Sequence, residues 1–414
     1  MTSFLIQNFG CRVNQAEAFG WAEEFQGRGL RLEKELTRSD LILVNSCTLT
    51  SRADRDVRQF IKKVVRINPR ARLILTGCYV ERSREEFGRI PQVWLIFSNG
   101  EKGSLASEVL ARLGPGEKAQ ILPYRSRALL KVQDGCDYRC SFCIIPSVRG
   151  ASVSLERAQV VARARTLVDR GYKEIVLSGI HLCSYGLDLG PESSLPELLR
   201  DLEKIDGLGL IRLSSLDPRF LKPEWLKCFT QSQKICQHFH LSLQHTSRRI
   251  LDRMGRKIGQ EDFRKILADF RQRSPEAALG ADIIVGFPEE TDEDFRAMAR
   301  FLEESPLTYF HVFPYSPRSG TAAAGFPQVN DKTKKERSDL LRKLSKKKNL
   351  EFRKSFLGRN CRGVVIKREK DRAEVLTSNY LKVIVPPTDT PAREIVQVLI
   401  SRVDAGATTG EIIA

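Results

Sequence analysis

The sequence contains no apolar run of about 18 residues, so no stretch is long enough to cross a bilayer as a helix. Its first residues, MTSFLIQNFG, lack a basic stretch followed by a long apolar segment, and we therefore expect no signal peptide. Only five of the 414 residues are histidine, which argues against a zinc site built on histidine. Together these absences favour a cytoplasmic protein that has no membrane partner.

Cysteine and positive charge are both abundant. Ten cysteines in a cytoplasmic chain indicate metal or redox chemistry rather than a disulfide framework. The net charge is +17, of which +11 falls on residues 331–372 and only +1 on residues 128–330. Such a concentrated basic segment suggests a polyanionic partner, in particular a nucleic acid.

Residues 1–127 alternate between short apolar runs and segments of helical composition. We expect strands at Ser3–Phe9, Leu41–Asn45, Arg72–Thr76 and Val93–Ser98, and helices at Asn14–Gln26, with Asn14 as its N-cap, and Ser51–Ile67. This alternation is typical of an α/β fold with a parallel sheet. Cys11, Cys47 and Cys78 each follow a predicted strand. Ligand sites gather at the carboxyl ends of such strands, so the three thiols either converge on a ligand or are three independent small side chains.

Six further strand–helix repeats follow a polar linker at residues 115–127. The strands are expected at Leu129–Val132, Glu174–Gly179, Leu210–Leu216, Phe239–Gln244, Ala281–Gly286 and Tyr309–Pro314. The helices are expected at Ser154–Gly171, Leu195–Ile205, Pro223–Ser232, Gln260–Arg273 and Glu290–Glu304. Six repeats predict a partial TIM-like (βα)6 barrel, because no room remains for the eight units of a complete one.

The last part of the chain is a basic helix followed by short strands. Asp331–Phe356 has helical composition and includes Lys346, Lys347 and Lys348 in a row. From Arg359 onward the segments CRGVVIK, RAEVLTS, YLKVIVP and IVQVLIS predict a small β-barrel. We therefore expect domains at residues 1–114, 128–330 and 358–414, with a basic helical connector at residues 331–357.

A cysteine-rich loop follows the first strand of the predicted barrel. Cys136, Cys140 and Cys143 have the spacing C-x3-C-x2-C, and no fourth cysteine is nearby. A structural zinc ion requires four protein ligands, so zinc is the weaker interpretation. A 4Fe-4S cluster held by three thiolates keeps one iron open to a small molecule. This loop is thus the first candidate functional site.

The loop and several other motifs resemble those of a known family. CDYRCSFC resembles the signature of the radical S-adenosylmethionine (SAM) superfamily. Further motifs occur in the order found in methylthiotransferases, namely GCRVNQAE, NSCTLTSRADRDVRQ, TGCY, GCDYRCSFCIIPSVRG, IVLSGIHLCSYG, HLSLQ, DIIVGFP, HVFPYSPRSGT and SNYLKVIVP. The resemblance covers nearly the whole chain and implies an N-terminal methylthiotransferase domain, a radical SAM core and a C-terminal TRAM domain. It is strongest for the branch that acts on N6-threonylcarbamoyladenosine.

This resemblance implies two 4Fe-4S clusters and SAM as cofactors. Cys136, Cys140 and Cys143 would bind the radical SAM cluster, and Cys11, Cys47 and Cys78 an auxiliary cluster. Radical chemistry is required because the C–H bond at carbon 2 of adenine is too unreactive for a side-chain acid or base. Cys183, Cys228, Cys236 and Cys361 are scattered, and we expect them not to be ligands, Cys183 being the least secure.

Candidate contacts to SAM lie near the ends of the barrel strands. They are Ser178, Gly179, His181, Ser214, Ser215, Gln244 and Asp282. His181 is equally consistent with a structural role, and Asp282 with capping a helix. The chain departs from the family pattern at His245-Thr246-Ser247 and at Glu289, which leaves the exact contacts open.

The expected reaction is methylthiolation of carbon 2 of N6-threonylcarbamoyladenosine at tRNA position 37. Candidate RNA contacts in the small barrel are Lys367, Arg368, Lys370, Arg372, Tyr380 and Lys382, although such residues also occur on ordinary soluble surfaces. Expected partners are tRNA, an electron donor such as flavodoxin or ferredoxin, and a sulfur source. The alternatives are isopentenyladenosine in tRNA or a ribosomal-protein aspartate as acceptor, or a non-catalytic, zinc-containing RNA-binding protein.

Overall fold

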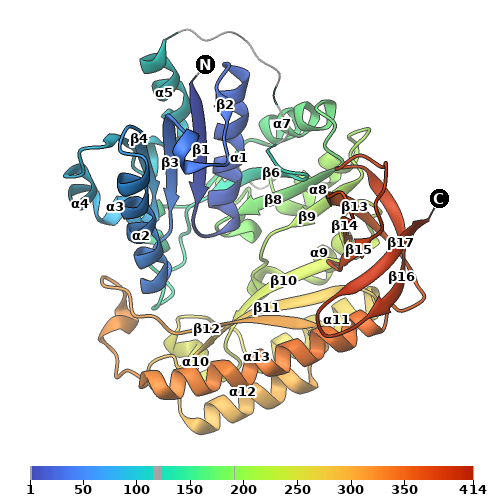
Figure 1. Cartoon of the computed structure of the whole chain (residues 1–414). Coiled ribbons are helices and arrows are strands. Elements are labelled where there is room, and N and C mark those ends of the chain that lie inside the picture. The colour runs from blue at the N-terminus through green and yellow to red at the C-terminus, as the bar shows by residue number, and fades with distance from the viewer. Residues whose placement is uncertain (1, 115–120, 122–123, 191, 414) are drawn as a thin grey trace. The chain divides into compact units, whose positions relative to one another are not determined.

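The computed structural model describes residues 2–114, 121, 124–190 and 192–413 (Figure 1). It consists of two compact units. Unit 1 comprises residues 1–125, 134–153 and 316–321, and unit 2 comprises residues 126–133, 154–315 and 322–414. The cysteine-rich loop after the first barrel strand therefore belongs to unit 1, and the small C-terminal barrel belongs to unit 2. Most of the predicted linker at residues 115–127 lies outside the described residues.

Unit 1 is built on a five-stranded parallel sheet of order β2-β1-β3-β4-β5. The strands are β1 (Ser3–Asn8), β2 (Arg31–Leu32), β3 (Leu41–Ser46), β4 (Arg72–Gly77) and β5 (Val93–Ile96). The helices are α1 (Arg12–Gly27), α2 (Ser51–Ile67), α3 (Cys78–Arg82), α4 (Arg84–Gly88), α5 (Leu105–Leu113) and α6 (Ile145–Arg149). The predicted parallel α/β sheet is confirmed.

Helices cover both faces of this sheet. Leu43 belongs to a core shared with α1 and α5, whereas Ile42 belongs to a second core shared with α2 and α3. Successive residues of a strand point to opposite faces, so β3 must be apolar on both sides. The first four residues of its sequence LILVNS are all apolar, as this requires. One detail of the prediction is wrong: α1 begins two residues before Asn14, and Cys11 occupies its N-cap.

Unit 2 contains a partial barrel of six parallel strands. They are β6 (Ala128–Asp134, whose last residue is in unit 1), β8 (Glu174–Gly179), β9 (Leu210–Leu213), β10 (His238–Gln244), β11 (Ala278–Val285) and β12 (Tyr309–Pro314), with the short β7 (Val153–Ser154) beside β6. The ladders run β6-β8-β9 and β10-β11-β12, and the bridge Leu216↔Leu241 joins the two halves. The predicted six-stranded partial barrel is thus confirmed.

The helices of unit 2 follow the strands as expected. They are α7 (Arg157–Asp169), α8 (Leu195–Glu203), α9 (Pro223–Gln231), α10 (Arg248–Arg253), α11 (Gln260–Arg273) and α12 (Asp292–Glu304). Thr291 caps α12 and forms a capping box with Asp294, so the polar residues before this helix set its start. The short helix α10 was not predicted from the sequence. None of the helices among the described residues is long and apolar enough to cross a membrane.

The C-terminal part consists of one long helix and a closed barrel. Helix α13 spans Asp331–Lys354 and packs on β12. The barrel strands are β13 (Asn360–Arg368), β14 (Ala373–Thr377), β15 (Lys382–Val385), β16 (Ile395–Val403) and β17 (Thr408–Ile413). They close in the order β13-β14-β15-β17-β16. The predicted small barrel is confirmed, with β17 as an additional strand.

A buried arginine connects the small barrel to the six-stranded core. The side chain of Arg212, in β9, is 2% exposed. Its Nε donates to Glu174 at 2.7 Å, and its two terminal nitrogens donate to the carbonyl oxygens of Thr377 and Ser378 at 3.0 and 3.1 Å. A buried guanidinium is stable only when its donors are satisfied, and here carbonyl oxygens of the small barrel complete the set.

We expect Arg212→Ala to lower the free energy of unfolding of unit 2 by about 3–5 kcal/mol, because a carboxylate at Glu174 is left buried without its main partner. Urea unfolding followed by circular dichroism measures the loss. Arg200→Ala is the control, since Arg200 pairs with Glu197 at the surface, where such a pair contributes about 1 kcal/mol or less. Equal midpoints for the two variants would contradict the role of Arg212.

Candidate functional site

Three cysteines converge at one edge of the sheet in unit 1. Cys11 follows β1, Cys47 follows β3, and Cys78 is the first residue of α3 after β4. Strands β1, β3 and β4 are neighbours in the sheet and parallel, so their carboxyl ends lie side by side. The thiols are close enough to interact electrostatically: Cys11 and Cys78 both contribute to the raised pKa of Cys47. The predicted convergence of the three thiols is therefore present in the fold.

Two glycines allow the chain to bring these thiols together. Gly10 has φ +105°, and a Cβ built on it would lie 2.8 Å from the Sγ of Cys47. Gly77 has φ +101°, and a Cβ there would lie 2.4 Å from the carbonyl oxygen of Ser46. Both positions combine a left-handed backbone with a close approach that only glycine permits. The local geometry therefore requires glycine directly before Cys11 and directly before Cys78.

The thiols are held in an environment that resists ionisation unless a cation is near. Burial raises the pKa of Cys47 to about 12, and burial also raises the pKa of Cys11. The guanidinium of Arg149 opposes both shifts. Because only the thiolate binds metal, a bound cluster and a nearby cation must together offset the cost of burying these charges.

Arg149 is that cation, and its side chain is fully buried. Its Nε donates to the Sγ of Cys78 at 3.3 Å, and its Nη2 donates to Asn14 Oδ1 at 2.6 Å. It also donates to Glu17 at 3.0 Å and to Asp134 at 2.7 Å. Burial alone would lower its pKa, but Glu17, Cys78 and Asp134 outweigh burial and raise it.

The carboxylate of Glu17 has a second cationic partner. The Nζ of Lys102 lies 2.6 Å from Glu17, and both side chains are less than 5% exposed. Asn45 donates to the same carboxylate at 3.1 Å. The charges behind the three thiols therefore form a closed network rather than an isolated ion pair.

The loop with the other three cysteines belongs to the same unit and ends at Arg149. The amide N–H of Cys136 donates to the carbonyl oxygen of Gly150 at 3.1 Å, which closes the loop at its base. The amide of Cys143 donates to the carbonyl oxygen of Cys140 at 3.0 Å. Through Arg149, this loop is hydrogen bonded directly to a thiol of the other triad. Arg149, Glu17 and Lys102 were not predicted as site residues. Charged residues that are far apart in the chain form no sequence motif that would show their contact.

Both triads fit iron–sulfur clusters by the chemistry of their donors. All six cysteines are free thiols, and each set offers three soft ligands. Cys47 and Cys78 are buried, whereas Cys11, Cys136, Cys140 and Cys143 are partly exposed. A partly exposed loop is compatible with a ligand that must enter and leave, and a set with two buried thiols is compatible with a group that stays.

Several predicted SAM contacts lie around the ends of β8 and β9. Ser178 is fully buried, and its hydroxyl has no hydrogen-bond partner among the described residues. The amide of Gly179 donates to Ser214 Oγ at 3.4 Å, and Ser215 is exposed. A buried hydroxyl without a partner is consistent with a missing ligand. These positions remain candidates for SAM.

His181 is held by protein groups on both ring nitrogens. Its Nε2 lies 3.1 Å from Asp217 and its Nδ1 lies 2.5 Å from Ser184 Oγ. Its backbone N–H donates to Gln133 Oε1 at 2.8 Å. Because both ring nitrogens already have partners, the geometry favours a structural role for His181 over a contact to SAM. Cys183, expected not to be a ligand, accepts a hydrogen bond from the Asp217 amide at 3.3 Å.

The last two SAM candidates differ in their surroundings. Gln244 ends β10 with φ +71°, a strained conformation for a residue other than glycine. Asp282 lies in the middle of β11 and not at a helix end, so the capping alternative is wrong. Burial would raise the pKa of Asp282, but hydrogen bonds from His240 and His311 outweigh burial and hold it below the usual range.

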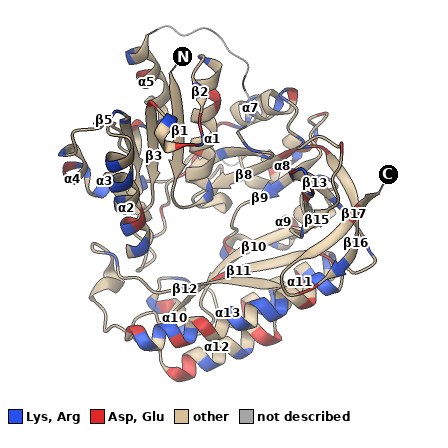
Figure 2. Cartoon of the chain, viewed as in Figure 1, with Lys and Arg blue, Asp and Glu red and all other residues tan. Residues whose placement is uncertain are grey.

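Three of the six candidate RNA contacts of the small barrel are engaged in surface ion pairs. Lys367 and Arg372 both contact Glu369, and Lys382 contacts Glu374 at 2.9 Å. Arg368 and Lys370 are exposed. Surface pairs of this kind are weak, so a phosphate can replace the carboxylate. Figure 2 shows further basic residues along α13, where Lys346 and Lys347 are exposed.

Tyr380 has a different setting from the other candidate RNA contacts. Its ring stacks on the ring of His238, with centroids 4.0 Å apart and planes 12° apart. The guanidinium carbon of Arg212 lies 5.3 Å from the ring centroid. This intramolecular stack argues against Tyr380 as a platform for a base.

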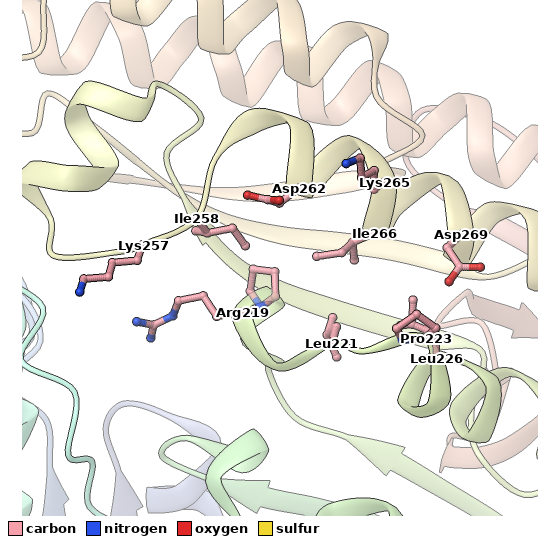
Figure 3. A pocket seen from close by; sticks show the side chains of 11 residues that line it. Arg219, Leu221, Pro223, Leu226, Lys257, Ile258, Asp262, Lys265, Ile266 and Asp269 are labelled. Atoms are coloured by element: carbon pink, nitrogen blue, oxygen red, sulfur yellow. The ribbon is translucent and has the colours of Figure 1, made fainter.

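One hollow in unit 2 is lined by other residues. It has a volume of about 420 Å³ and is lined by side chains from η4 (Pro218–Phe220), α9 and α11 (Figure 3). Arg219 points along it together with Lys257, while Asp262 and Asp269 come from α11 (Figure 3). None of the predicted SAM or metal residues lines this hollow.

Comparison with known proteins identifies the family. Residues 130–302 match the "Radical SAM superfamily", and residues 3–98 match the "Uncharacterized protein family UPF0004". A "Threonylcarbamoyladenosine tRNA methylthiotransferase MtaB" of Aquifex aeolicus is 35% identical over 396 residues, which cover 91% of this chain and 95% of that protein. The chain belongs to the radical SAM methylthiotransferase family. The resemblance noted in the sequence is thereby confirmed, and with it a transferase that uses SAM and 4Fe-4S clusters.

Relatives outside this branch of the methylthiotransferases are somewhat less similar. A "tRNA-2-methylthio-N(6)-dimethylallyladenosine synthase" of Geobacter metallireducens is 30% identical, over 98% of this chain and 97% of that protein. Among solved structures, the radical SAM methyltransferase TsrM of Kitasatospora setae has a TM-score of 0.57 at 15% identity, over 78% of this chain and 77% of that one. At this identity the likeness concerns the fold alone.

Arg149 gives a direct test of the charge network in this methylthiotransferase. We expect Arg149→Ala to destabilise unit 1 by about 3 kcal/mol or more, because Glu17 and Asp134 lose a buried partner. The midpoint of urea unfolding measures the change. Arg139→Ala, an exposed change in the same loop, should stay within about 0.5 kcal/mol of the parent protein. An Arg149→Ala protein as stable as Arg139→Ala would refute the network.

Proposed function

We propose that this enzyme methylthiolates carbon 2 of N6-threonylcarbamoyladenosine at position 37 of tRNA. The observation that carries the proposal is the 35% identity, over 91% of the chain, to a relative named for that nucleoside. The relative named for dimethylallyladenosine is 30% identical over a similar share. The basic α13 and small barrel support an RNA substrate, because phosphates bind to clustered lysine and arginine.

The six cysteines divide into two ligand sets in this proposal. Cys136, Cys140 and Cys143 would hold the radical SAM cluster, and Cys11, Cys47 and Cys78 the auxiliary cluster. When bound, these clusters and SAM supply the electron-transfer and radical chemistry that side chains lack. The domains would be an N-terminal methylthiotransferase domain at residues 1–114, a radical SAM core at residues 128–330 and a TRAM-like domain at residues 358–414.

The protein's own residues position and shield the reacting groups. Arg149 holds the base of the Cys136–Cys143 loop against Cys78 at 3.3 Å, which fixes one triad relative to the other within unit 1. Gly10 and Gly77 permit the close packing of Cys47 and Cys78. Asp217 orients His181, and Gln133 holds the backbone that follows β8. A rigid arrangement of this kind keeps reactants aligned and excludes competing hydrogen donors.

The proposal includes a cellular context. The enzyme would act in the cytoplasm, where its tRNA substrate is found. It would require an electron donor such as flavodoxin or ferredoxin to reduce the clusters, and a source of sulfur for the product. These partners follow from the reaction itself, because neither electrons nor sulfur come from the polypeptide.

Cysteine variants test the two ligand sets. Anaerobically purified protein should contain about eight irons per chain, and Cys140→Ala and Cys47→Ala about four each. Cys140→Ala should produce no 5′-deoxyadenosine from SAM, whereas Cys47→Ala should retain some. Cys228→Ala serves as control and should keep all the iron, since Cys228 is outside both sets. Full iron content in Cys47→Ala would contradict the auxiliary site.

Analysis of tRNA nucleosides tests the substrate. In cells without this protein, the 2-methylthio derivative of N6-threonylcarbamoyladenosine should disappear, and its unmodified precursor should accumulate. Mass spectrometry of digested tRNA measures both. Loss of the methylthio derivative of isopentenyladenosine instead would replace the proposed acceptor and leave the family unchanged. Loss of a methylthiolated aspartate, measured in digested ribosomal protein, would do the same.

A further inference from the structure

Three of the five histidines gather on one face of the sheet β10-β11-β12. His238 and His240 lie on β10, and His311 lies on β12. Strand β11 lies between them and contributes Asp282 (Figure 1). The low histidine count argued against a histidine-based metal site, but a count does not report where the residues gather.

This face points away from the helices that cover the sheet. Phe239 of β10 stacks on Phe270 of helix α11, with ring centroids 4.6 Å apart, so His238 and His240 lie on the other face of the sheet. Residues paired across the ladders share a face, and His240 pairs with Gly280, which in turn pairs with Tyr309. Because successive residues of a strand alternate, His311 lies on the same side as Tyr309. The side chain of His311 is 57% exposed there.

Three ligand atoms on this face lie within 4.8 Å of one another. The Nε2 of His240 is 2.9 Å from Asp282 Oδ1, and the Nδ1 of His311 is 3.3 Å from the same oxygen. The register explains the arrangement, since Asp282 pairs directly with His311 across the ladder. His240 reaches the carboxylate from the other side, opposite Gly280.

Neighbouring residues fix the orientation of His240. The hydroxyl of Tyr309 lies 3.0 Å from His240 Nδ1 and 2.7 Å from His238 Nε2. A Cβ on Gly280 would lie 2.4 Å from that hydroxyl and 2.6 Å from His240 Nδ1, so only glycine leaves room for this contact. The contact at Nδ1 presents Nε2 toward Asp282, as an outer-shell partner does for a metal-binding histidine.

We propose that His240, Asp282 and His311 bind one divalent transition-metal ion, with Tyr309 as the outer-shell group. Metal bonds of about 2.0–2.2 Å place adjacent ligands roughly 2.9–3.5 Å apart, and the observed separations from Asp282 fall in that range. Two imidazoles and one carboxylate suit zinc or ferrous iron. None of the ligands of this site is one of the six cysteines, and the proposal does not depend on the proposed function.

Three protein ligands leave coordination positions open. His311 is exposed to solvent and Asp282 is 22% exposed, so solvent reaches these positions. Oxygen ligands such as water, a hydroxyl or a carboxylate would fill them. The site is thus of the open kind that binds small ligands, in contrast to a closed structural zinc site with four protein ligands.

Zinc itself is the probe for this site. Anaerobic protein with both clusters in place is incubated with Zn²⁺ and desalted, and its zinc and iron contents are measured. We expect the parent protein to retain about one zinc per chain more than His311→Ala, with the same iron content in both. His311→Ala is suitable because an exposed side chain is removed without opening the core.

Two further variants complete the experiment. Phe313→Ala removes another exposed side chain from the same face of β12 and should retain zinc like the parent protein. Tyr309→Phe removes only the hydroxyl at His240 and should weaken zinc binding about 10–100-fold in competition with a chelator. If the parent protein and His311→Ala retain equal zinc, the three residues form a hydrogen-bonded cluster without a metal, and the proposal is overturned.

Discussion

The site in unit 1 depends on one buried cation. Thiolates inside a protein repel one another and lose hydration, so they need a positive group whose own burial is offset. Arg149 meets this requirement because it contacts Cys78 on one side and the carboxylates of Glu17 and Asp134 on the other. The same side chain belongs to the loop that carries the second set of cysteines. The hydrogen bonds of Arg149 therefore both compensate the buried negative charges and hold the two triads in place relative to each other.

A similar principle holds in unit 2, where Arg212 joins a carboxylate of the barrel core to backbone carbonyls of the small barrel. In both units a guanidinium with several donors spans segments that are far apart in sequence. Arginine suits this task because its planar group makes several directed hydrogen bonds while remaining charged. The RNA-binding part proposed for the chain is consequently held on the catalytic core by buried polar contacts, and not only by surface charge.

Much of the fold followed from local patterns. Four strands and the two long helices of unit 1, and the six strands of the barrel, were predicted to within a few residues, because apolar runs and their spacing reflect burial directly. The two-residue strand β2 and the shorter helices α3 to α6 of unit 1 were not predicted. The cysteine ligand candidates were also visible, since their motifs are short and unusual. Asn14 shows the limit of local reasoning: as a good N-cap residue it was placed at the start of α1, yet it lies inside the helix and binds Arg149.

The sequence by itself determined the family, the alternation of strands and helices, and the two sets of three cysteines, because each of these features depends on short contiguous motifs. Only the tertiary structure decided which side chains meet. It gave His181 the partners Asp217 and Ser184, and it stacked Tyr380 on His238. It also brought His240, Asp282 and His311 together from three adjacent strands. Such groupings depend on strand order and register, which fix neighbours across a sheet and leave no trace in the spacing along the chain.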